Sequence, residues 1–346
     1  MVCRIVLVVL VWSFSIANSF SQSLASISGK ISDAKTKEPL PGAAVYLANT
    51  TIGAVANTDG TFSLHNIHPG KYDLTISMIG YAQFSKSVII EGKPLTGFDI
   101  LLASETEELN PLEVSAKRSN RKTDFAEFKK LFLGQTENSS HCTIVNIHDI
   151  FVYKDGTTLH ALSHKPIEVV NYALGYRIFF DLKEFAIDYF YNRAVMSGIP
   201  RFEEMTPESP RQKERWDRER DRAYYGSPEH FFRSLKKRAL KDNYFKTSDP
   251  KDHEISLDSL LKNSGDSVIH FKGNLKVVFN HERPEYFYNL KSNVQVSTLR
   301  FGTGQTKIYD NGYYGLQDIL LSGYMGWSCR IADMVPLGYQ PITKLK

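Results

Sequence analysis

The chain has 346 residues, of which 42% are hydrophobic, so it is long enough for two domains with sizeable cores. Its 42 Lys and Arg residues exceed its 38 Asp and Glu residues by only four, a net charge of +4. This small excess argues against a nucleic-acid-binding surface, because such surfaces are strongly basic.

The first residues predict a secretory signal peptide over residues 1–21. The basic residue Arg4 precedes an apolar stretch over residues 5–16, and small residues follow that suit a signal peptidase. The apolar stretch is too short to span a membrane, and no later stretch reaches the required length of about 18 residues. We therefore expect an exported mature chain that begins near Phe20 or Gln22 and has no transmembrane helix.

Residues 26–103 alternate apolar and polar side chains in short segments, which is the period of half-buried strands. Turn residues separate these segments, as in Pro41-Gly42, in Asn57-Thr58-Asp59-Gly60 and in His68-Pro69-Gly70. The strands are expected near residues 27–31, 43–47, 53–57, 62–64, 72–78, 88–90 and 98–102. Seven short strands at this spacing predict a β-sandwich.

The same segment resembles the carboxypeptidase-like regulatory domain. The resemblance is carried by the stretches GKISDAKTKEPLPGAAVYL, TDGTFSL and PGKYDLTISMIGY, which lie within residues 26–103. It implies a transthyretin-like (prealbumin-like) sandwich, common in envelope proteins of Bacteroidetes-type bacteria, without catalytic residues of its own. We therefore expect a cell-envelope protein located in the periplasm or associated with the outer membrane.

Residues 104–122 read as a linker that is first acidic and then basic, with a short apolar patch at Leu112-Glu113-Val114. Few contacts should hold such a charged stretch. We expect limited proteolysis to separate the two domains here.

Residues 123–346 predict an α+β domain of unknown function, with an antiparallel sheet and a helical insert, so that the whole chain is mostly β. A first helix should begin at Asp124, end at Gly134 and bury its aromatic face against the sheet. Strands are expected at 142–153 and 157–163, on both sides of Gly175 within 167–191, and at 268–279, 286–290, 293–301 and 305–309. The insert should contain a charged, solvent-exposed helix over 211–222, a helix over about 228–240 and a short helix over 257–261.

The second domain contains no motif that identifies a reaction. None of the ten histidines is followed three residues later by Glu, as a zinc carboxypeptidase requires, and Gly-x-Ser-x-Gly is absent. His160 and His164 lie four residues apart, on one face of a strand, with Glu168 nearby, and form a weak metal candidate. We expect no catalytic residue and no cofactor.

Two cysteines, Cys142 and Cys329, remain after export. An exported compartment permits a disulfide between them, and the alternative is two buried, unpaired thiols.

These patterns favour a non-enzymatic exported envelope protein. The sandwich would serve interaction or stability, and the second domain would bind a protein or glycan partner. The aromatic run over residues 167–191 could be core or the lining of a ligand groove. The alternative is an unrecognised hydrolase or peptidase in residues 123–346.

Overall fold

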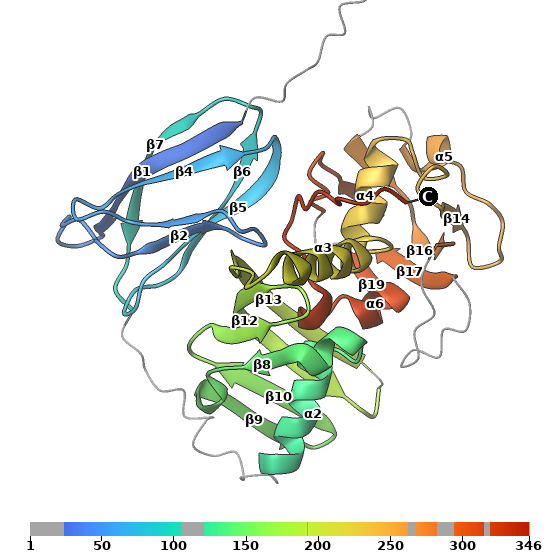
Figure 1. The fold of residues 1–346 in the computed structure, drawn as a ribbon, viewed down its shortest axis with the longest axis horizontal. Coiled ribbons are helices and arrows are strands. Elements are labelled where there is room, and N and C mark those ends of the chain that lie inside the picture. The colour runs from blue at the N-terminus through green and yellow to red at the C-terminus, as the bar shows by residue number, and fades with distance from the viewer. Residues whose placement is uncertain are drawn as a thin grey trace, which may run out of the picture.

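The computed structural model describes residues 24–105, 121–191, 193–261, 267–281, 294–314 and 319–345. The expected signal peptide, most of the linker and the strand expected at 286–290 lie outside these residues. A β-sandwich occupies one side of the molecule, and the rest of the chain forms two lobes with helix α3 between them (Figure 1). No helix in the described ranges combines the length and apolar character needed to cross a membrane.

The N-terminal region forms the expected sandwich of seven strands. They are β1 (Ala25–Asp33), β2 (Ala44–Leu47), β3 (Gly53–Val55), β4 (Thr61–Ile67), β5 (Gly70–Ser77), β6 (Phe84–Ile90) and β7 (Leu95–Leu102). One sheet has the order β4-β1-β7 and the other β3-β2-β5-β6. Strands β1 and β7 are parallel, and the other pairs are antiparallel. Their inward side chains, such as Ile27 and Leu74, form a single buried core.

Glycine is required at one position of this core. A Cβ on Gly29 of β1 would lie 2.2 Å from the Phe98 carbonyl oxygen of β7. Any larger residue would push β7 away from β1, so this glycine permits the close pairing of the two strands.

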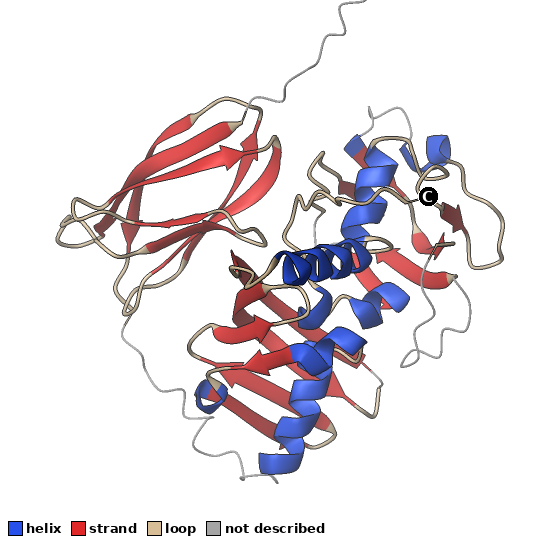
Figure 2. Ribbon diagram, in the orientation of Figure 1, coloured by secondary structure: helices blue, strands red, loops and turns tan. Residues whose placement is uncertain are grey.

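The first lobe is a six-stranded antiparallel sheet covered by one helix, α2 (Arg121–Leu133) (Figure 2). The strands are β8 (Cys142–Ile144), β9 (Ile150–Asp155), β10 (Thr158–Ser163), β11 (Ile167–Asn171), β12 (Tyr176–Asp188) and β13 (Arg193–Glu204). The long strand β12 pairs with β11 along its first part, with β10 along its last part, and with β13 over its whole length.

The aromatic face of α2 packs on β12, as its spacing predicted. Phe128 and Phe132 stack with ring centroids 5.0 Å apart, and both are fully buried. Their rings also make edge contacts with Phe185 and Phe180 of β12, at 5.0 and 5.5 Å. The expected cap was wrong, because the helix begins at Arg121 and places Asp124 inside it.

The sequence analysis did not predict the edge strand β13, and it predicted one continuous strand at residues 142–153. A 3-10 turn at Ile147–Asp149 divides the strand expected at 142–153. Strand β13 contains Gly198 and Pro200, which usually weaken a strand assignment. A Cβ on Gly198 would lie 2.3 Å from the Phe180 ring, and Pro200 is accommodated because β13 is an edge strand.

The second lobe contains a four-stranded antiparallel sheet of order β14-β16-β17-β19 and a small pair, β15-β18. The strands are β14 (Phe245–Ser248), β15 (Val268–His270), β16 (Gly273–Phe279), β17 (Gln295–Phe301), β18 (Gln305–Lys307) and β19 (Ile319–Gly323). The helices are α4 (Pro228–Lys236), α5 (Leu257–Leu261) and α6 (Tyr324–Ser328). The described residues after the linker therefore form two larger sheets, a small strand pair and two cores, where the sequence suggested one sheet.

Helix α3 (Pro210–Tyr224) crosses between the two lobes (Figure 1). We expected it to be solvent-exposed, but Trp216, Arg220, Asp221 and Tyr224 are buried. The Arg220 guanidinium carbon lies 4.0 Å from the Tyr176 ring centre, and its Nε donates to the Leu174 carbonyl at 2.7 Å. The alternating charges of this segment gave no indication that one face of the helix packs against the first lobe.

The turn between β2 and β3 attaches the sandwich to the first lobe and to the C-terminal segment. The Asn49 N–H donates to the Pro200 carbonyl at 2.7 Å, and the Phe202 N–H donates to the Thr50 carbonyl at 3.0 Å. The Leu337 N–H donates to the Asn49 carbonyl at 2.6 Å. Asn49 has φ +63°, a conformation that Asn and Gly adopt more readily than other residues.

Strand β5 attaches the sandwich to the second lobe. The Asn311 side-chain amide donates to the Lys71 carbonyl at 2.8 Å, and the Tyr313 hydroxyl donates to the Asp73 carboxylate at 3.0 Å. The Lys71 ammonium lies 4.8 Å from the Tyr313 ring centre. The sandwich is thus bonded to both lobes.

These contacts predict that cleavage within residues 104–122 leaves the two fragments associated. After limited proteolysis, size-exclusion chromatography should show the sandwich fragment co-eluting with the remainder of the chain. The variant Asn49→Pro should release it, because proline removes the N–H and cannot adopt positive φ.

Asn49→Gly is the matched control, since it keeps both the N–H and the conformation. Release of the sandwich from the cleaved wild-type chain would contradict the docked arrangement.

Candidate functional site

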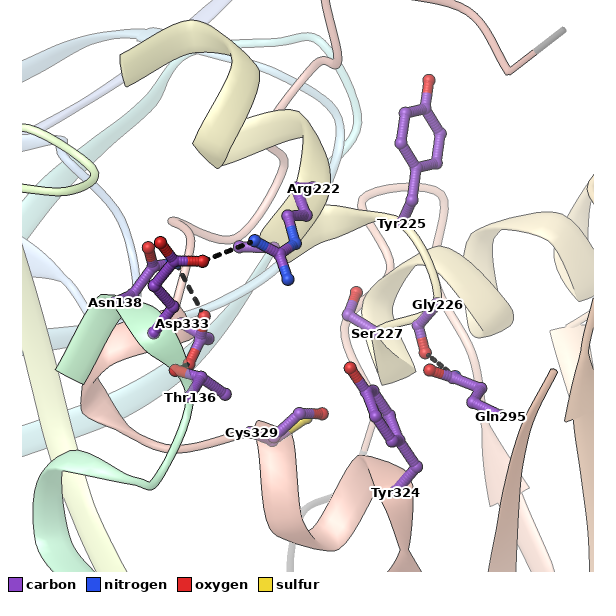
Figure 3. Close-up of a pocket in the computed structure, with 13 residues that line it drawn as sticks. Thr136, Asn138, Arg222, Tyr225, Gly226, Ser227, Gln295, Tyr324, Cys329 and Asp333 are labelled. Carbon is purple, nitrogen blue, oxygen red and sulfur yellow. Dashed lines mark hydrogen bonds and ion pairs between the residues drawn. The ribbon is translucent and has the colours of Figure 1, made fainter. Parts of the chain in front are cut away.

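Two adjoining cavities lie beside the C-terminal segment; the two lobes line the smaller one, and the sandwich contributes Asn49 to the larger one. The smaller has a volume of about 40 Å³ and is shown in Figure 3. Its lining comes from the segments 136–138, 222–227 and 324–333 together with Gln295. A space of this size accommodates water molecules but no organic ligand.

One wall of the small cavity is a polar cluster around Asp333 (Figure 3). The Thr136 hydroxyl donates to one carboxylate oxygen of Asp333, and the Asn138 amide donates to the other at 2.8 Å. Arg222 lies 3.7 Å from the Glu137 carboxylate. These bonds tie the C-terminal segment to the start of the first lobe, and their main effect is structural.

The opposite wall contains Gln295, whose residue is 1% exposed. Its Nε2 donates to the Gly226 carbonyl at 2.7 Å, and its Oε1 has no hydrogen-bond partner among the described atoms. Buried acceptors usually have a hydrogen-bond donor, and the adjacent cavity is large enough for a water molecule that could donate to this oxygen.

The larger cavity has a volume of about 140 Å³ and mostly apolar walls. Its lining includes Asn49 of the sandwich, Pro228 and Glu229 of α4, Tyr313, Tyr314, Met334, Val335 and Leu337. Pockets with apolar walls and one polar group commonly form at the junctions of structural units.

Glu229 is the buried carboxyl group of this cavity. It accepts a hydrogen bond from the Gly338 N–H at 2.9 Å and lies 3.6 Å from the Arg233 guanidinium. Burial raises the pKa of Glu229 to about 8, although Arg233 and the Gly338 N–H favour its charged form.

Ser227 and His230 beside the cavities fix the connection between α3 and α4. The Ser227 hydroxyl accepts from the His230 N–H at 3.2 Å and caps α4, as the sequence predicted. His230 Nδ1 accepts from the Gly226 N–H at 3.1 Å, and its Nε2 lies 3.2 Å from the Asn243 amide oxygen. Burial lowers the pKa of His230 to about 4, so the ring is neutral at physiological pH.

Cys329 lines both cavities, but burial raises the pKa of its thiol to about 12. Nucleophilic cysteines need the opposite shift, because the thiolate is the reactive form. Cys329 is therefore poorly suited to act as a nucleophile.

The weak metal candidates lie on β10, directly after it, and on β11. His160 on β10 stacks on Tyr153 with ring centroids 5.0 Å apart, and His164 follows the same strand. Glu168 on β11 is ion-paired with Arg177 at 3.4 Å. Within the described ranges, no group of three His, Cys, Asp or Glu side chains could hold a metal ion.

Cys142 and Cys329 are free thiols in the structure. Cys142 lies on β8 and donates to the Asn138 carbonyl at 3.5 Å, whereas Cys329 follows α6. Burial raises the pKa of both thiols to about 12. The disulfide remains a prediction.

The sequence reading missed Glu229, Arg233, Asp333 and Gln295 as members of this junction. A signal for the first two was present, because Glu229 and Arg233 lie four residues apart in a helix whose neighbouring residues Phe232 and Leu235 are apolar. Asp333 and Gln295 gave no local signal, since their partners are far away in the sequence.

The raised pKa of Glu229 predicts a pH-dependent stability. The folded state binds the proton of Glu229 more tightly than the unfolded state does. The stability that this proton provides is therefore fully present below the ordinary pKa of 4.5 and is lost as the pH rises to about 8. The melting temperature of the wild type, minus that of Glu229→Gln, should therefore fall over this range. His230 is common to both proteins and cancels in the difference. A flat or rising difference would contradict the burial of this carboxyl.

Thiol burial predicts slow alkylation in the folded chain. An iodoacetamide-type reagent should modify Cys142 and Cys329 rapidly only after unfolding in denaturant without reductant, with mass spectrometry as the readout. Two unreactive cysteines in the unfolded, unreduced chain would instead support the disulfide.

Residues 27–114 match the family model of the CarboxypepD_reg-like domain. No protein with a curated description shows significant similarity to the chain.

Solved structures similar to the chain include two sandwich-containing proteins. The pilus 2b backbone protein of group B streptococcus is 20% identical, with a TM-score of 0.21 over 24% of this chain and 42% of that one. The 5-hydroxyisourate hydrolase of Klebsiella pneumoniae is 20% identical, with a TM-score of 0.20 over 24% of this chain and 92% of that one. The chain thus spans less than half of the length of the pilus protein. From the family match and its seven strands, the N-terminal sandwich of this chain is a CarboxypepD_reg-like domain.

Proposed function

We propose that this chain is a non-enzymatic, exported cell-envelope protein that binds a partner through its second domain. The N-terminal domain belongs to a non-catalytic regulatory type of sandwich, which supports a role in stability or interaction. The export signal and the periplasmic or outer-membrane location are part of this proposal and come from the sequence pattern.

The packing of the sandwich supports its role as a stabilising module. Tyr46 on β2 is buried beside Arg201 of β13, whose guanidinium carbon lies 5.8 Å from the Tyr46 ring and 4.1 Å from that of Phe179. Nearby, the Lys183 ammonium donates to the Gln83 amide oxygen at 2.8 Å. Burial raises the pKa of Tyr46 to about 12, so the hydroxyl stays neutral in this interface.

The observation that carries the binding function is the aromatic tip of the β12–β13 hairpin. Phe190 is 74% exposed and Tyr191 is 67% exposed, with their rings 4.9 Å apart in an edge-to-face arrangement. The Asp188 carboxylate accepts hydrogen bonds from both of their backbone N–H groups, at 2.9 and 3.1 Å.

A fixed backbone beneath two exposed rings favours partner binding. Aromatic side chains dominate the energetics of interfaces, and pre-ordered ones lose less conformational entropy on binding. The expected partner is an envelope protein or a glycan, since either offers apolar or ring surfaces to stack on. The aromatic residues of 167–191 therefore fall into two groups. Tyr176, Phe180 and Phe185 belong to the core, and the residues of the hairpin tip are exposed.

The double variant Phe190→Ala/Tyr191→Ala should lose partner retention by tenfold or more, as about 2 kcal/mol for an aromatic anchor implies. The measurement is quantitative pull-down from an envelope fraction, repeated with deproteinised envelope glycan to distinguish the two partner classes. Tyr172→Ala is the matched control, because Tyr172 is a half-exposed aromatic elsewhere in the same lobe.

Unchanged retention by the double variant would reject the hairpin tip as the binding surface. The alternative function, a hydrolase or peptidase in residues 123–346, would be supported by peptide hydrolysis that His160→Ala or His164→Ala abolishes.

A further inference from the structure

The turn that follows β18 contains the only Asn-Gly dipeptide of the sequence, Asn311-Gly312. An asparagine before glycine loses its side-chain amide more readily than before any other residue. The reason is that glycine has no Cβ to hinder its backbone nitrogen as it attacks the preceding side chain. The chemical stability of this dipeptide therefore depends on its surroundings in the fold.

Hydrogen bonds hold both of the groups that would react. Asn311 is 5% exposed, and its Nδ2 donates to the Lys71 carbonyl of the sandwich at 2.8 Å. Its Oδ1 accepts from the Tyr313 N–H at 3.2 Å, and the Gly312 N–H donates to the Tyr309 carbonyl at 2.9 Å. The attacking nitrogen and the leaving amide are thus both tied to other atoms.

The sandwich encloses Asn311 from one side. A Cβ on Gly70, at the start of β5, would lie 2.4 Å from the Asn311 Cγ. A Cβ on Gly312 would lie 2.5 Å from the Glu229 Cγ of α4. The dipeptide therefore lies between β5 and α4, and the sandwich supplies one of its two walls.

The reaction of such a dipeptide needs only water. The Gly312 nitrogen loses its proton and bonds to the Asn311 Cγ, while the Cγ–Nδ2 bond breaks and the amide leaves with that proton as ammonia. Water then opens the resulting succinimide ring at one of its two carbonyls. The products are aspartate, or isoaspartate in which the main chain runs through the former side chain.

Either product opposes the contact with the sandwich. A carboxylate at position 311 would keep the Tyr313 N–H as a donor, but it would turn its second oxygen toward the Lys71 carbonyl oxygen. Burial of a charged oxygen against another acceptor is strongly unfavourable. Isoaspartate would also lengthen the main chain of the turn.

We propose that Asn311 is a site of spontaneous deamidation, which the docked sandwich protects and whose conversion keeps β5 off the second lobe. The reaction would start from the minority of molecules in which this contact is open, since folded proteins open locally. The turn around Asn49 has its own hydrogen bonds and would still hold the sandwich to the first lobe. This inference does not depend on the binding function proposed above.

The first test measures the rate of deamidation at Asn311 in the full chain. Purified protein is incubated at mildly alkaline pH, and peptide mapping by mass spectrometry follows the loss of the amide. Gly70→Ala should raise the rate by about tenfold or more, because the new Cβ displaces Asn311 from the Lys71 carbonyl. Gly80→Ala is the matched control with the wild-type rate, since Gly80 also has a positive φ but nothing lies within 4 Å of its Cβ position.

A second pair of variants serves in case Gly70→Ala does not fold. Tyr313→Phe keeps the ring but loses the hydrogen bond to Asp73, so the rate should rise by about threefold. Tyr309→Phe should keep the wild-type rate, because its hydroxyl has no hydrogen bond recorded within the described ranges. Wild-type rates in both Gly70→Ala and Tyr313→Phe would overturn the proposal, and so would a folded wild type that deamidates as fast as the denatured chain.

The effect of the product is tested on the chain cleaved within residues 104–122. In Asn311→Asp, the sandwich fragment should dissociate from the remainder at least tenfold more readily than in the wild type, as measured by size-exclusion chromatography on dilution. Asn311→Ala loses the same hydrogen bond without placing an oxygen against the Lys71 carbonyl, so it should have a smaller effect. Wild-type retention in Asn311→Asp would reject the release of the sandwich by deamidation.

Discussion

Three backbone hydrogen bonds at the turn around Asn49 hold the sandwich, the first lobe and the C-terminal segment together. Each contributes only about 1 kcal/mol net, but a buried backbone group left without a partner costs more. The geometry is also restrictive, because Asn49 must keep a positive φ. Its partner Pro200 accepts through its carbonyl and, as a proline, has no N–H that would need a partner of its own. The larger cavity depends on the same turn, since Asn49 is part of its wall.

Buried ionisable side chains are the second recurring feature, and backbone groups are their main hydrogen-bond partners. Asp221 and Glu229 accept backbone N–H groups, while Arg220 and Arg233 donate to backbone carbonyls. Such contacts define the positions of chain segments without requiring particular side chains on them. At the same junction the neutral His230 ring is hydrogen-bonded at both nitrogens, and burial keeps the Cys329 thiol protonated.

The sequence predicted elements whose signals are local. Period-two alternation located the seven sandwich strands, and the Ser227-Pro228-Glu229 cap located the start of α4. Features that depend on distant partners were missed or misjudged. Gly198 argued against a strand because nothing near it in the sequence shows that the Phe180 ring occupies the space of a side chain there. Helix α3 looked solvent-exposed because its contacts with Tyr176 and with Tyr339 of the C-terminal segment involve residues far away in the sequence. Both cavities belong to this second class.

The parallel pairing of β1 with β7 has a mechanical consequence. Their register runs from Ile27 beside Leu95 to Asp33 beside Leu102, so the chain enters the sandwich at one pole and leaves it at the other. A pull between an attachment before β1 and the second domain would act along both strands in opposite directions. All hydrogen bonds of the β1–β7 ladder would then bear the load together in shear, whereas peeling would break them one at a time. Parallel pairing of its first and last strands therefore makes this domain resistant to a pull applied at its two ends.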